Sequence, residues 1–176
     1  MSSARLILPE EMEYFISPSR GKRDFFQVID DVVEFIDGDR QSTYAVVVGT
    51  DSEQYTSPRV GVGLAEFVTV VTVHRVGKYG RYFWKRMNGV KTYDHHDRML
   101  KEASFSLDVA QRVMDQLRPR LMDRLYDFEI HLDIGHNGPT KTMISEIVGM
   151  ITGNGFTARI KPDAWAANKV ADRHVG

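Results

Sequence analysis

The chain of 176 residues is predicted to form an α/β domain, with a mixed five-stranded sheet, helices on both faces and a preceding N-terminal helix. Two observations predict this class. The run Tyr44 to Val48 is apolar on both faces of an extended strand, which is typical of the centre of a sheet. After one hairpin, helix and strand patterns alternate to the end of the chain, as they do in right-handed crossover units.

The N-terminal part is expected to be an extension of the main domain, with residues 1–42 in the extension and residues 43–176 in the domain. Apolar residues at helical spacing predict a helix over Asp24 to Ile36 that stops at Gly38 and packs on the domain. The basic segment Ser19 to Arg23 before it is expected to be a solvated loop, with contact to an anionic ligand as the alternative.

The central strand is expected to end at Asp51 and to be followed by a hairpin. A β-rich segment over Val60 to Val76 turns at Gly77 to Gly80, and Arg81 to Met87 forms the return strand. Asn88-Gly89 is a candidate tight turn in the same region.

The second half is expected to alternate helices and strands. The long helix is predicted over Asp94 to Arg118, because Pro119 lies just beyond its apolar stripe. The later elements are a strand over Phe128 to Ile134, a helix over Pro139 to Thr152, a strand over Phe156 to Ile160 and a last helix over Ala164 to His174.

Composition narrows the class of protein. The absence of cysteine excludes disulfides and thiolate metal sites, and fits a reducing compartment. No apolar stretch approaches the roughly 20 residues that cross a bilayer, and Glu10, Glu11 and Glu13 lie where a signal peptide would be apolar. We therefore expect a soluble cytoplasmic protein without a membrane partner. The net charge of −1 argues against a protein that coats nucleic acid non-specifically.

Four acidic residues lie where solvation alone explains them poorly. Asp51 and Asp133 end strands that we expect to be neighbours, about 4.8 Å apart. Glu102 borders the apolar stripe of the long helix, and Asp172 lies on the last helix, whose alanines allow close approach to the sheet. Taken singly, each acid is explained equally well as a turn former or an exposed helix residue.

Taken together, the four acids favour a metal site. Clustered carboxylates raise one another's pKa unless a cation neutralises them. Oxygen ligands without cysteine favour Mg²⁺ or Mn²⁺, and two such ions about 3.5–4 Å apart can hydrolyse a phosphodiester.

Several motifs make the sequence more specific. They are Val48-Gly49-Thr50-Asp51-Ser52, Leu132-Asp133-Ile134-Gly135 with Asn137-Gly138, Ile147-Val148-Gly149-Met150, and Ile160-Lys161-Pro162-Asp163-Ala164 running to Val170-Ala171-Asp172. With these motifs, residues 43–174 resemble the ribonuclease H fold and, more closely, the bacterial YkuK family of ribonuclease H-like proteins. The resemblance implies a divalent-metal nuclease in which Asp51 is shared by both ions, with Glu102, Asp133 and Asp172 around it. Asp97 is the alternative to Glu102, and Asp163 the alternative to Asp172, although an N-cap explains Asp163 more simply.

The hairpin combines basic and aromatic residues. There is no acidic residue between Glu66 and Asp94. The basic residues are Arg75, Lys78, Arg81, Lys85, Arg86 and Lys91, interleaved with Tyr79, Tyr82, Phe83, Trp84 and Tyr93. Such a surface suits a phosphate backbone with exposed bases, so we expect RNA, DNA or a hybrid as the partner. The alternative is an ordinary hairpin in which packed aromatic residues alternate with solvated basic ones.

The histidines carry weaker signals. His95 and His96 lie at the start of the long helix, where a capping role competes with metal binding. His131 shares a strand face with Asp133 and is expected to be a hydrogen-bonded core residue. His174 could move protons near the last carboxylate, or belong to a frayed end.

The expected function is phosphodiester hydrolysis with Mg²⁺ or Mn²⁺. The main alternative is an inactive scaffold of the same fold that binds nucleic acid or a protein partner. A third interpretation is a nucleotide-binding module, because Asp133 to Thr140 resembles the phosphate loop of actin-like ATPases. Those proteins need two such domains, so this interpretation ranks last. The choice between endonuclease and exonuclease and the oligomeric state stay open.

Overall fold

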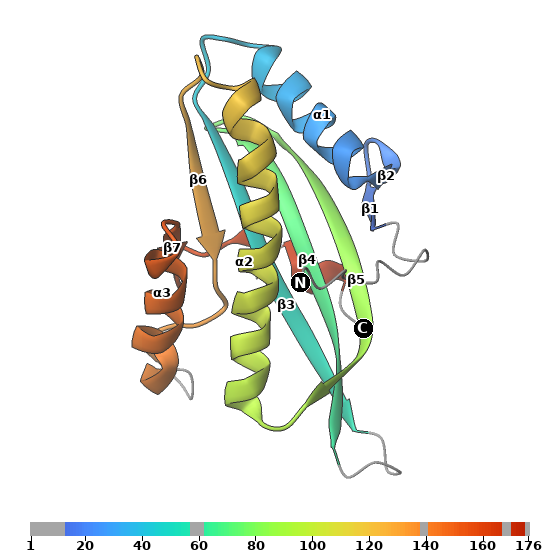
Figure 1. Ribbon diagram of the computed structural model, residues 1–176, viewed down its shortest axis with the longest axis vertical. Helices are drawn as coiled ribbons and strands as arrows, with labels where there is room; N and C mark the ends of the chain where they lie inside the picture. The colour runs from blue at the N-terminus through green and yellow to red at the C-terminus, as the bar shows by residue number, and fades with distance from the viewer. Residues whose placement is uncertain (1–12, 57–61, 138–140, 167–169, 175–176) are drawn as a thin grey trace, which may run out of the picture.

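The fold is a seven-stranded mixed sheet with its long helices on one face (Figure 1). The structure, a computed structural model, describes residues 13–56, 62–137, 141–166 and 170–174. The strands are β1 Tyr14–Ser17, β2 Gly21–Asp24, β3 Tyr44–Thr56, β4 Gly63–Arg75, β5 Gly80–Thr92, β6 Tyr126–His131 and β7 Thr157–Arg159. The helices are α1 Phe25–Asp37, α2 His95–Arg120 and α3 Ile144–Gly153, with short 3₁₀ helices η1 Lys141–Met143 and η3 Asp172–His174.

The predicted α/β class and the central position of β3 are confirmed. The strand order is β2-β1-β5-β4-β3-β6-β7, with β3 antiparallel to β4 and parallel to β6. The predicted count of five strands is wrong. The N-terminal extension contributes β1 and β2, which pair with each other and join the sheet where Ile16 pairs with Trp84 of β5.

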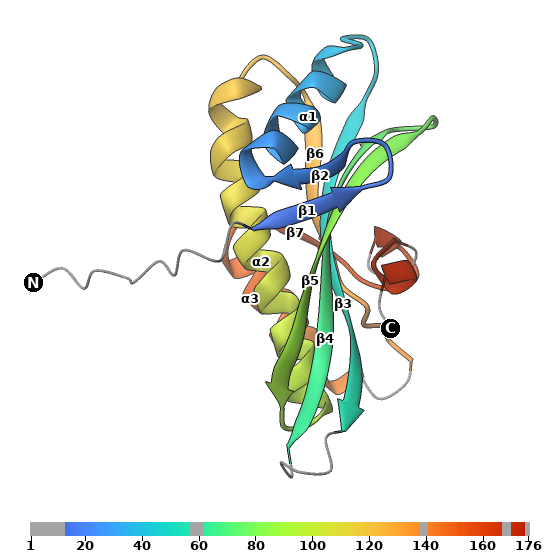
Figure 2. The ribbon, with the colours of Figure 1, turned by 90° about the vertical axis from the view of Figure 1, so that its right-hand side faces the viewer.

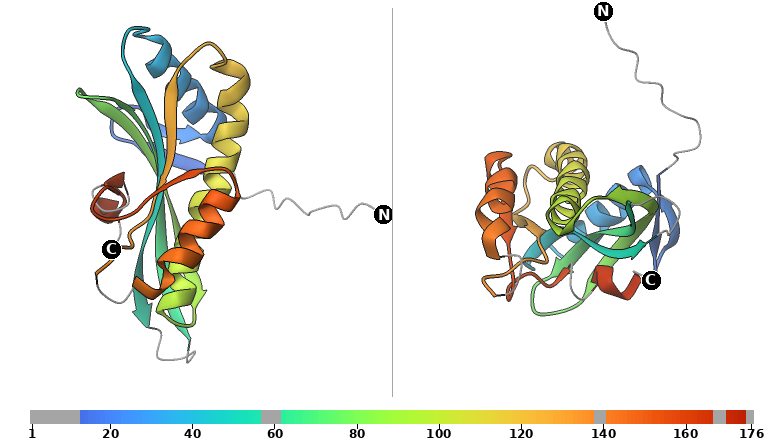
Figure 3. Two further views of the ribbon diagram at one scale, coloured as in Figure 1. Left: turned by 90° about the vertical axis from the view of Figure 1, so that its left-hand side faces the viewer. Right: turned by 90° about the horizontal axis from the view of Figure 1, so that it is seen from below.

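The two faces of the sheet are covered differently (Figures 2 and 3). Helices α1, α2 and α3 cover one face, called here the helix face, and enclose the main core with buried β3 residues such as Val46 and Val48. The described parts of the C-terminal segment, residues 164–166 and 170–174, cross the other face (Figure 2). A small second cluster of Val68, Val70 and Ala171 packs there.

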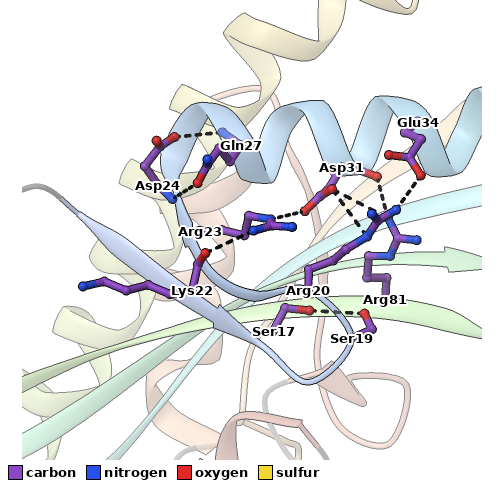
Figure 4. A network of polar contacts seen from close by, with 10 residues as sticks. All are labelled: Ser17, Ser19, Arg20, Lys22, Arg23, Asp24, Gln27, Asp31, Glu34 and Arg81. Carbon is purple, nitrogen blue, oxygen red and sulfur yellow. Dashed lines mark hydrogen bonds and ion pairs between the residues drawn. The ribbon is translucent and has the colours of Figure 1, made fainter.

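Helix α1 starts one residue later than expected because Asp24 is its N-cap. The Asp24 carboxylate accepts from the Gln27 backbone N–H at 2.9 Å, and the Gln27 side chain accepts from the Asp24 N–H at 3.0 Å. The basic segment before α1 is not merely a solvated loop. Arg20 and Arg23 pair with the buried Asp31 of α1 at 3.5 and 2.9 Å (Figure 4).

Strand β3 does not end at Asp51, contrary to the prediction. Its ladder with β4 continues through the pair of Asp51 with Val68 to the pair of Thr56 with Gly63. Backbone pairing therefore extends the strand beyond its apolar run. Asp51 lies inside β3, and β6 ends before it.

The tight turn expected at Asn88-Gly89 is also wrong. Ala65 pairs with Val90 and Phe67 with Met87, so Asn88 and Gly89 together oppose Glu66 in a β-bulge. Gly89 has a φ of 69°, which a glycine adopts without steric cost. Strand β5 consequently continues to Thr92.

The ends of the later elements shift for local reasons. Helix α2 passes Pro119 and ends at Arg120, because a proline in the last turn removes one N–H while Leu121 N–H still bonds the Leu117 carbonyl. The expected helix from Pro139 begins as η1, and Pro139 itself lies outside the described residues. In the expected last helix Ala164 and Trp165 are not helical, and residues 167–169 lie outside the described ranges. In the part of the chain that the structure describes, no helix has both the length and the hydropathy of a membrane span.

Candidate active site

Asp51 points to the sheet face opposite the helices. On either side of it, Thr50 accepts a hydrogen bond from Ser106 of α2 at 2.9 Å, and Ser52 donates to Glu102 of α2 at 2.5 Å. Side chains alternate between the faces of a strand, so Thr50 and Ser52 face the helices and Asp51 faces away. We call this opposite side, which also carries the C-terminal segment, the Asp51 face.

Asp133 follows the neighbouring strand at the matching height. The parallel ladder of β3 with β6 ends at the pair of Gly49 with His131. Two residues further along each chain come Asp51 and Asp133, and adjacent strands lie about 4.8 Å apart. The Oδ1 atom of Asp133 is 2.7 Å from the Lys161 ammonium. The register thus brings two acids together, with one of them already paired to a cation.

Glu102 is a buried carboxyl beside these two acids. It is 4% exposed, and its Oε1 accepts from Ser52 and lies 4.0 Å from the Arg98 guanidinium. The pKa of Glu102 is raised to about 8, chiefly by burial; the charges of Asp51 and Asp133 add to the shift, while the Ser52 hydrogen bond and Arg98 oppose it. Glu102 is therefore an electrostatic neighbour of both other acids.

Ser52 connects acids that lie on opposite faces of β3. Its backbone N–H donates to Asp51 at 2.8 Å while its hydroxyl donates to Glu102. Arg98 holds Ser52 from the helix side, donating to its carbonyl at 2.8 Å and to its hydroxyl at 3.0 Å. The ladder with β6 stops at Gly49, so around Asp51 the two faces meet at the edge of β3.

His131 anchors the C-terminal segment to the Asp51 face. The ring is 1% exposed, and its Nδ1 accepts from the backbone N–H groups of Trp165 at 3.1 Å and Ala166 at 3.2 Å. Its Nε2 lies 3.0 Å from Glu129, which assigns the proton to Nε2. Burial lowers the pKa of His131 and keeps the ring neutral. The predicted core histidine is confirmed.

The backbone of Asp172 lies on the same face. Ala171 packs in a cluster with Val68 and Val70 of β4, and Val68 is the direct partner of Asp51. Asp172 is the next residue and starts η3. Its side chain lies outside what the structure describes, so its role as a ligand stays a prediction.

The alternative acid and the helix-start histidines have other partners. Asp97 accepts from the Tyr93 N–H at 3.0 Å and pairs with Lys101 at 2.5 Å, which holds it at the start of α2. His96 lies 2.7 Å from Glu146 and ties α2 to α3. His95 lies 3.3 Å from Arg98. These contacts favour Glu102 over Asp97.

Most basic residues of the hairpin pair with acids, and all of these except Arg86 do so with acids outside the hairpin. Arg75 and Lys78 lie 3.7 and 3.9 Å from Asp39, Arg81 lies 4.0 Å from Asp31, Lys85 pairs with Glu13, and Arg86 lies 3.4 Å from Glu66. Lys91 is exposed and has no ion pair within the described ranges. The local positive charge inferred from the hairpin sequence is therefore reduced by the fold.

Three residues near the site were not predicted from the sequence to lie there. Lys161 belongs to the motif from Ile160 to Ala164, but its approach to Asp133 depends on how the fold joins distant segments. Ser52 follows Asp51 in its motif, which was the available signal. Glu66 pairs with Glu53 across the β3–β4 ladder, and strand alternation could have placed both on the Asp51 face.

The chemistry of these side chains fits a hard divalent cation. Burial, and to a lesser extent the charges of Asp51 and Asp133, raise the pKa of Glu102 to about 8, and a nearby divalent cation would favour its ionised form. In their present rotamers, no three His, Asp or Glu residues of the described part form a group ready to hold an ion. Binding would require Asp133 to turn from Lys161 and Glu102 to lose its proton.

Comparison with known proteins defines the class. The family model described as ribonuclease H-like matches residues 27–175. Over 170 residues the chain is 31% identical to the uncharacterized protein YkuK of Bacillus subtilis (strain 168). The matched region covers 90% of this chain and 95% of that protein. No solved structure matches the chain significantly. The chain belongs to the ribonuclease H-like proteins of the YkuK family. Its family match begins within α1, inside the predicted extension.

Proposed function

We propose that this protein is a nuclease that hydrolyses phosphodiester bonds of RNA or DNA with Mg²⁺ or Mn²⁺, in a site for two ions. The observation that carries the proposal is the placement of the acids: Asp51 and Asp133 come two residues beyond the last pair of β3 with β6, and Ser52 joins Asp51 to the buried Glu102. The ribonuclease H-like family supports the same function, although a fold alone does not define a reaction. The cytoplasm is the compartment we expect.

The proposed ligands are Asp51, Glu102, Asp133 and Asp172, with Asp51 shared between the ions. The cations would supply an activated water and stabilise the leaving oxygen. The chain's own residues orient the ligands: Ser52 holds Asp51 and Glu102, and Arg98 holds Ser52. Lys161 balances the charge of Asp133 when the site is without metal.

The proposed binding surface for nucleic acid remains the basic hairpin residues, namely Arg75, Lys78, Arg81, Lys85, Arg86 and Lys91. Among them we rank Arg86 first. It pairs with Val68, which pairs with Asp51, so the three residues form one row across the sheet. Directly paired residues share a face, so Arg86 lies on the Asp51 face.

The second candidate is an inactive scaffold. It is favoured by one observation: Lys161 pairs with Asp133, and Arg98 approaches Glu102, so protein cations already offset part of the charge. A scaffold of this kind would bind nucleic acid without cleaving it.

Cleavage assays distinguish the two. Labelled RNA, DNA and hybrid strands are incubated with purified protein in Mg²⁺, in Mn²⁺ and in chelator, with identically purified Asp51→Asn protein as the control for contaminating nucleases. We expect cleavage that requires metal and is absent from the variant. Folded protein that cleaves none of these strands in either metal supports the scaffold.

A further inference from the structure

On the Asp51 face, β5 carries two aromatic side chains and an arginine, called here the platform. Tyr82, Trp84 and Arg86 alternate along the strand and so project from the same face. The imidazole of His174 lies on this platform. Its centroid is 4.3 Å from that of Trp84 with an interplanar angle of 12°, and 5.8 Å from that of Tyr82. The chain thus places one of its own flat rings on Trp84 in a parallel stack.

Arg86 completes the contact with His174. Its guanidinium donates to the His174 carbonyl and lies 5.6 Å from the Trp84 ring centroid. The side chain of His174 fits less well, because its Nε2 is buried and has no hydrogen-bond partner among the described residues. A buried polar atom without a partner costs about 1–3 kcal/mol. The platform therefore suits a flat ring, but the histidine leaves one of its polar atoms unsatisfied.

The platform lies close to the acids. The row Asp51, Val68, Arg86 crosses two strand spacings, and the next row joins Gly49, Val70 and Trp84. Two spacings amount to roughly 10 Å between the backbones at Asp51 and Arg86. A strand with one phosphate at Asp51 could reach the platform with a nearby base.

We propose that Tyr82, Trp84 and Arg86 form a subsite that stacks one base of a single-stranded nucleic acid, and that His174 occupies this subsite in the free protein and leaves when a strand binds. Every base has a face that can stack on an aromatic ring, whereas a duplex keeps its bases inside. The inference rests on the proposed function for the kind of ligand, but it concerns binding and requires no cleavage.

Binding in chelator tests the subsite without the nuclease reaction. Labelled single-stranded DNA is titrated against wild type and Trp84→Leu, with an abasic strand of equal length as the probe for phosphate contacts alone. Stacking of one base contributes about 1–3 kcal/mol, so Trp84→Leu should weaken binding of the base-bearing strand about 5- to 140-fold. Binding of the abasic strand should be unchanged. Phe26→Leu, which shortens an exposed aromatic residue on α1, is the matched control and should change neither.

His174→Ala tests the occupant. Removing a competitor should raise the affinity for the base-bearing strand several-fold and leave the abasic strand unaffected. An unchanged or lower affinity would mean that His174 has only a structural role. It would overturn the proposal that a base displaces His174 from the subsite.

A fluorescence measurement keeps the inference testable if Trp84→Leu does not fold. The chain has two tryptophans, so Trp165→Phe leaves Trp84 as the sole reporter. We expect the base-bearing strand to quench its emission in chelator and the abasic strand to leave it unchanged. Equal responses to both strands would overturn the subsite. Absence of cleavage in Mn²⁺ would instead count against the nuclease alone.

Discussion

Asp51 is the residue on which the proposed metal site depends most. Asp51→Asn keeps the size of the side chain but removes an anionic ligand, so Mn²⁺ affinity and cleavage should both fall by several orders of magnitude. Without metal, stability should hold or rise, because a charge that raises the pKa of Glu102 is lost. Thermal melts with and without Mn²⁺ measure both effects. Asp127→Asn, an exposed acid on β6, is the control. If Mn²⁺ does not change the melting temperature of the wild type, and the variant melts identically, the assignment of Asp51 as a metal ligand is contradicted.

Glu102 predicts how stability without metal depends on pH. Its folded pKa of about 8 lies above the ordinary value of 4.5, so the folded state binds this proton more tightly than the unfolded chain. The resulting stabilisation is complete below pH 4.5, declines as pH rises and is lost above pH 8. Urea unfolding in chelator across this range should show the decline, and Glu102→Gln should flatten it. A wild-type profile as flat as that of the variant would show that Glu102 titrates normally.

At the scale of single residues, the sequence identified acids better than it identified their partners. The proximity of Asp51, Asp133 and Glu102 was predictable because the two aspartates follow apolar runs and Glu102 borders an apolar stripe, and their role as metal ligands stays a prediction. Lys161 was not predictable, because its contact with Asp133 depends on how separate segments meet in space. The charge of the basic hairpin was overestimated for the same reason, since Asp31, Asp39 and Glu13 pair with it from distant positions.

At the scale of elements, His131 holds the C-terminal segment in place. His131→Phe preserves a flat ring but leaves the Trp165 and Ala166 N–H groups without their acceptor. We expect local stability to fall by about 1–3 kcal/mol. Hydrogen exchange should accelerate at these two amides while the core strands stay protected. The control is His74→Phe, whose ring also contacts Trp165 but accepts neither N–H. Uniform acceleration across the sheet would instead mean that His131 stabilises the whole fold.

The existence of the long elements was predictable, and so to within one residue were the ends of α1, but the ends of the long strands were not. Apolar periodicity located α1, α2 and the central strand, because these elements bury a continuous stripe or run. The extensions of β3 to Thr56 and β5 to Thr92 depend on ladder pairing between the strands. Strand β2 is the segment Gly-Lys-Arg-Asp, which reads as a loop and becomes a strand by pairing with β1.

At the scale of the whole molecule, removing a basic charge should have different effects on the two faces of the sheet. Arg86→Gln acts on the Asp51 face and should weaken nucleic-acid binding and reduce the salt slope by about one. Lys85→Gln acts on the helix face, where Lys85 pairs with Glu13, so it should lower the melting temperature by about 2–4 °C and reduce the salt slope less than Arg86→Gln does. Titrations at several salt concentrations measure the slopes. Equal slopes for both variants would mean that the faces do not differ in binding.

The early end of β6 has a consequence for self-association. Beyond Gly49, no described strand pairs with β3 on that side, so this part of β3 is a sheet edge, where side chains of Arg98 and Asp51 bond the Ser52 carbonyl and N–H. Such edges invite pairing with another chain, and charged side chains discourage it. Asp51 and Glu53 supply charge along this stretch. Neutralising both should therefore favour dimers or aggregates, which light scattering would detect. Asp51→Asn, designed only to remove a metal ligand, should show part of this effect.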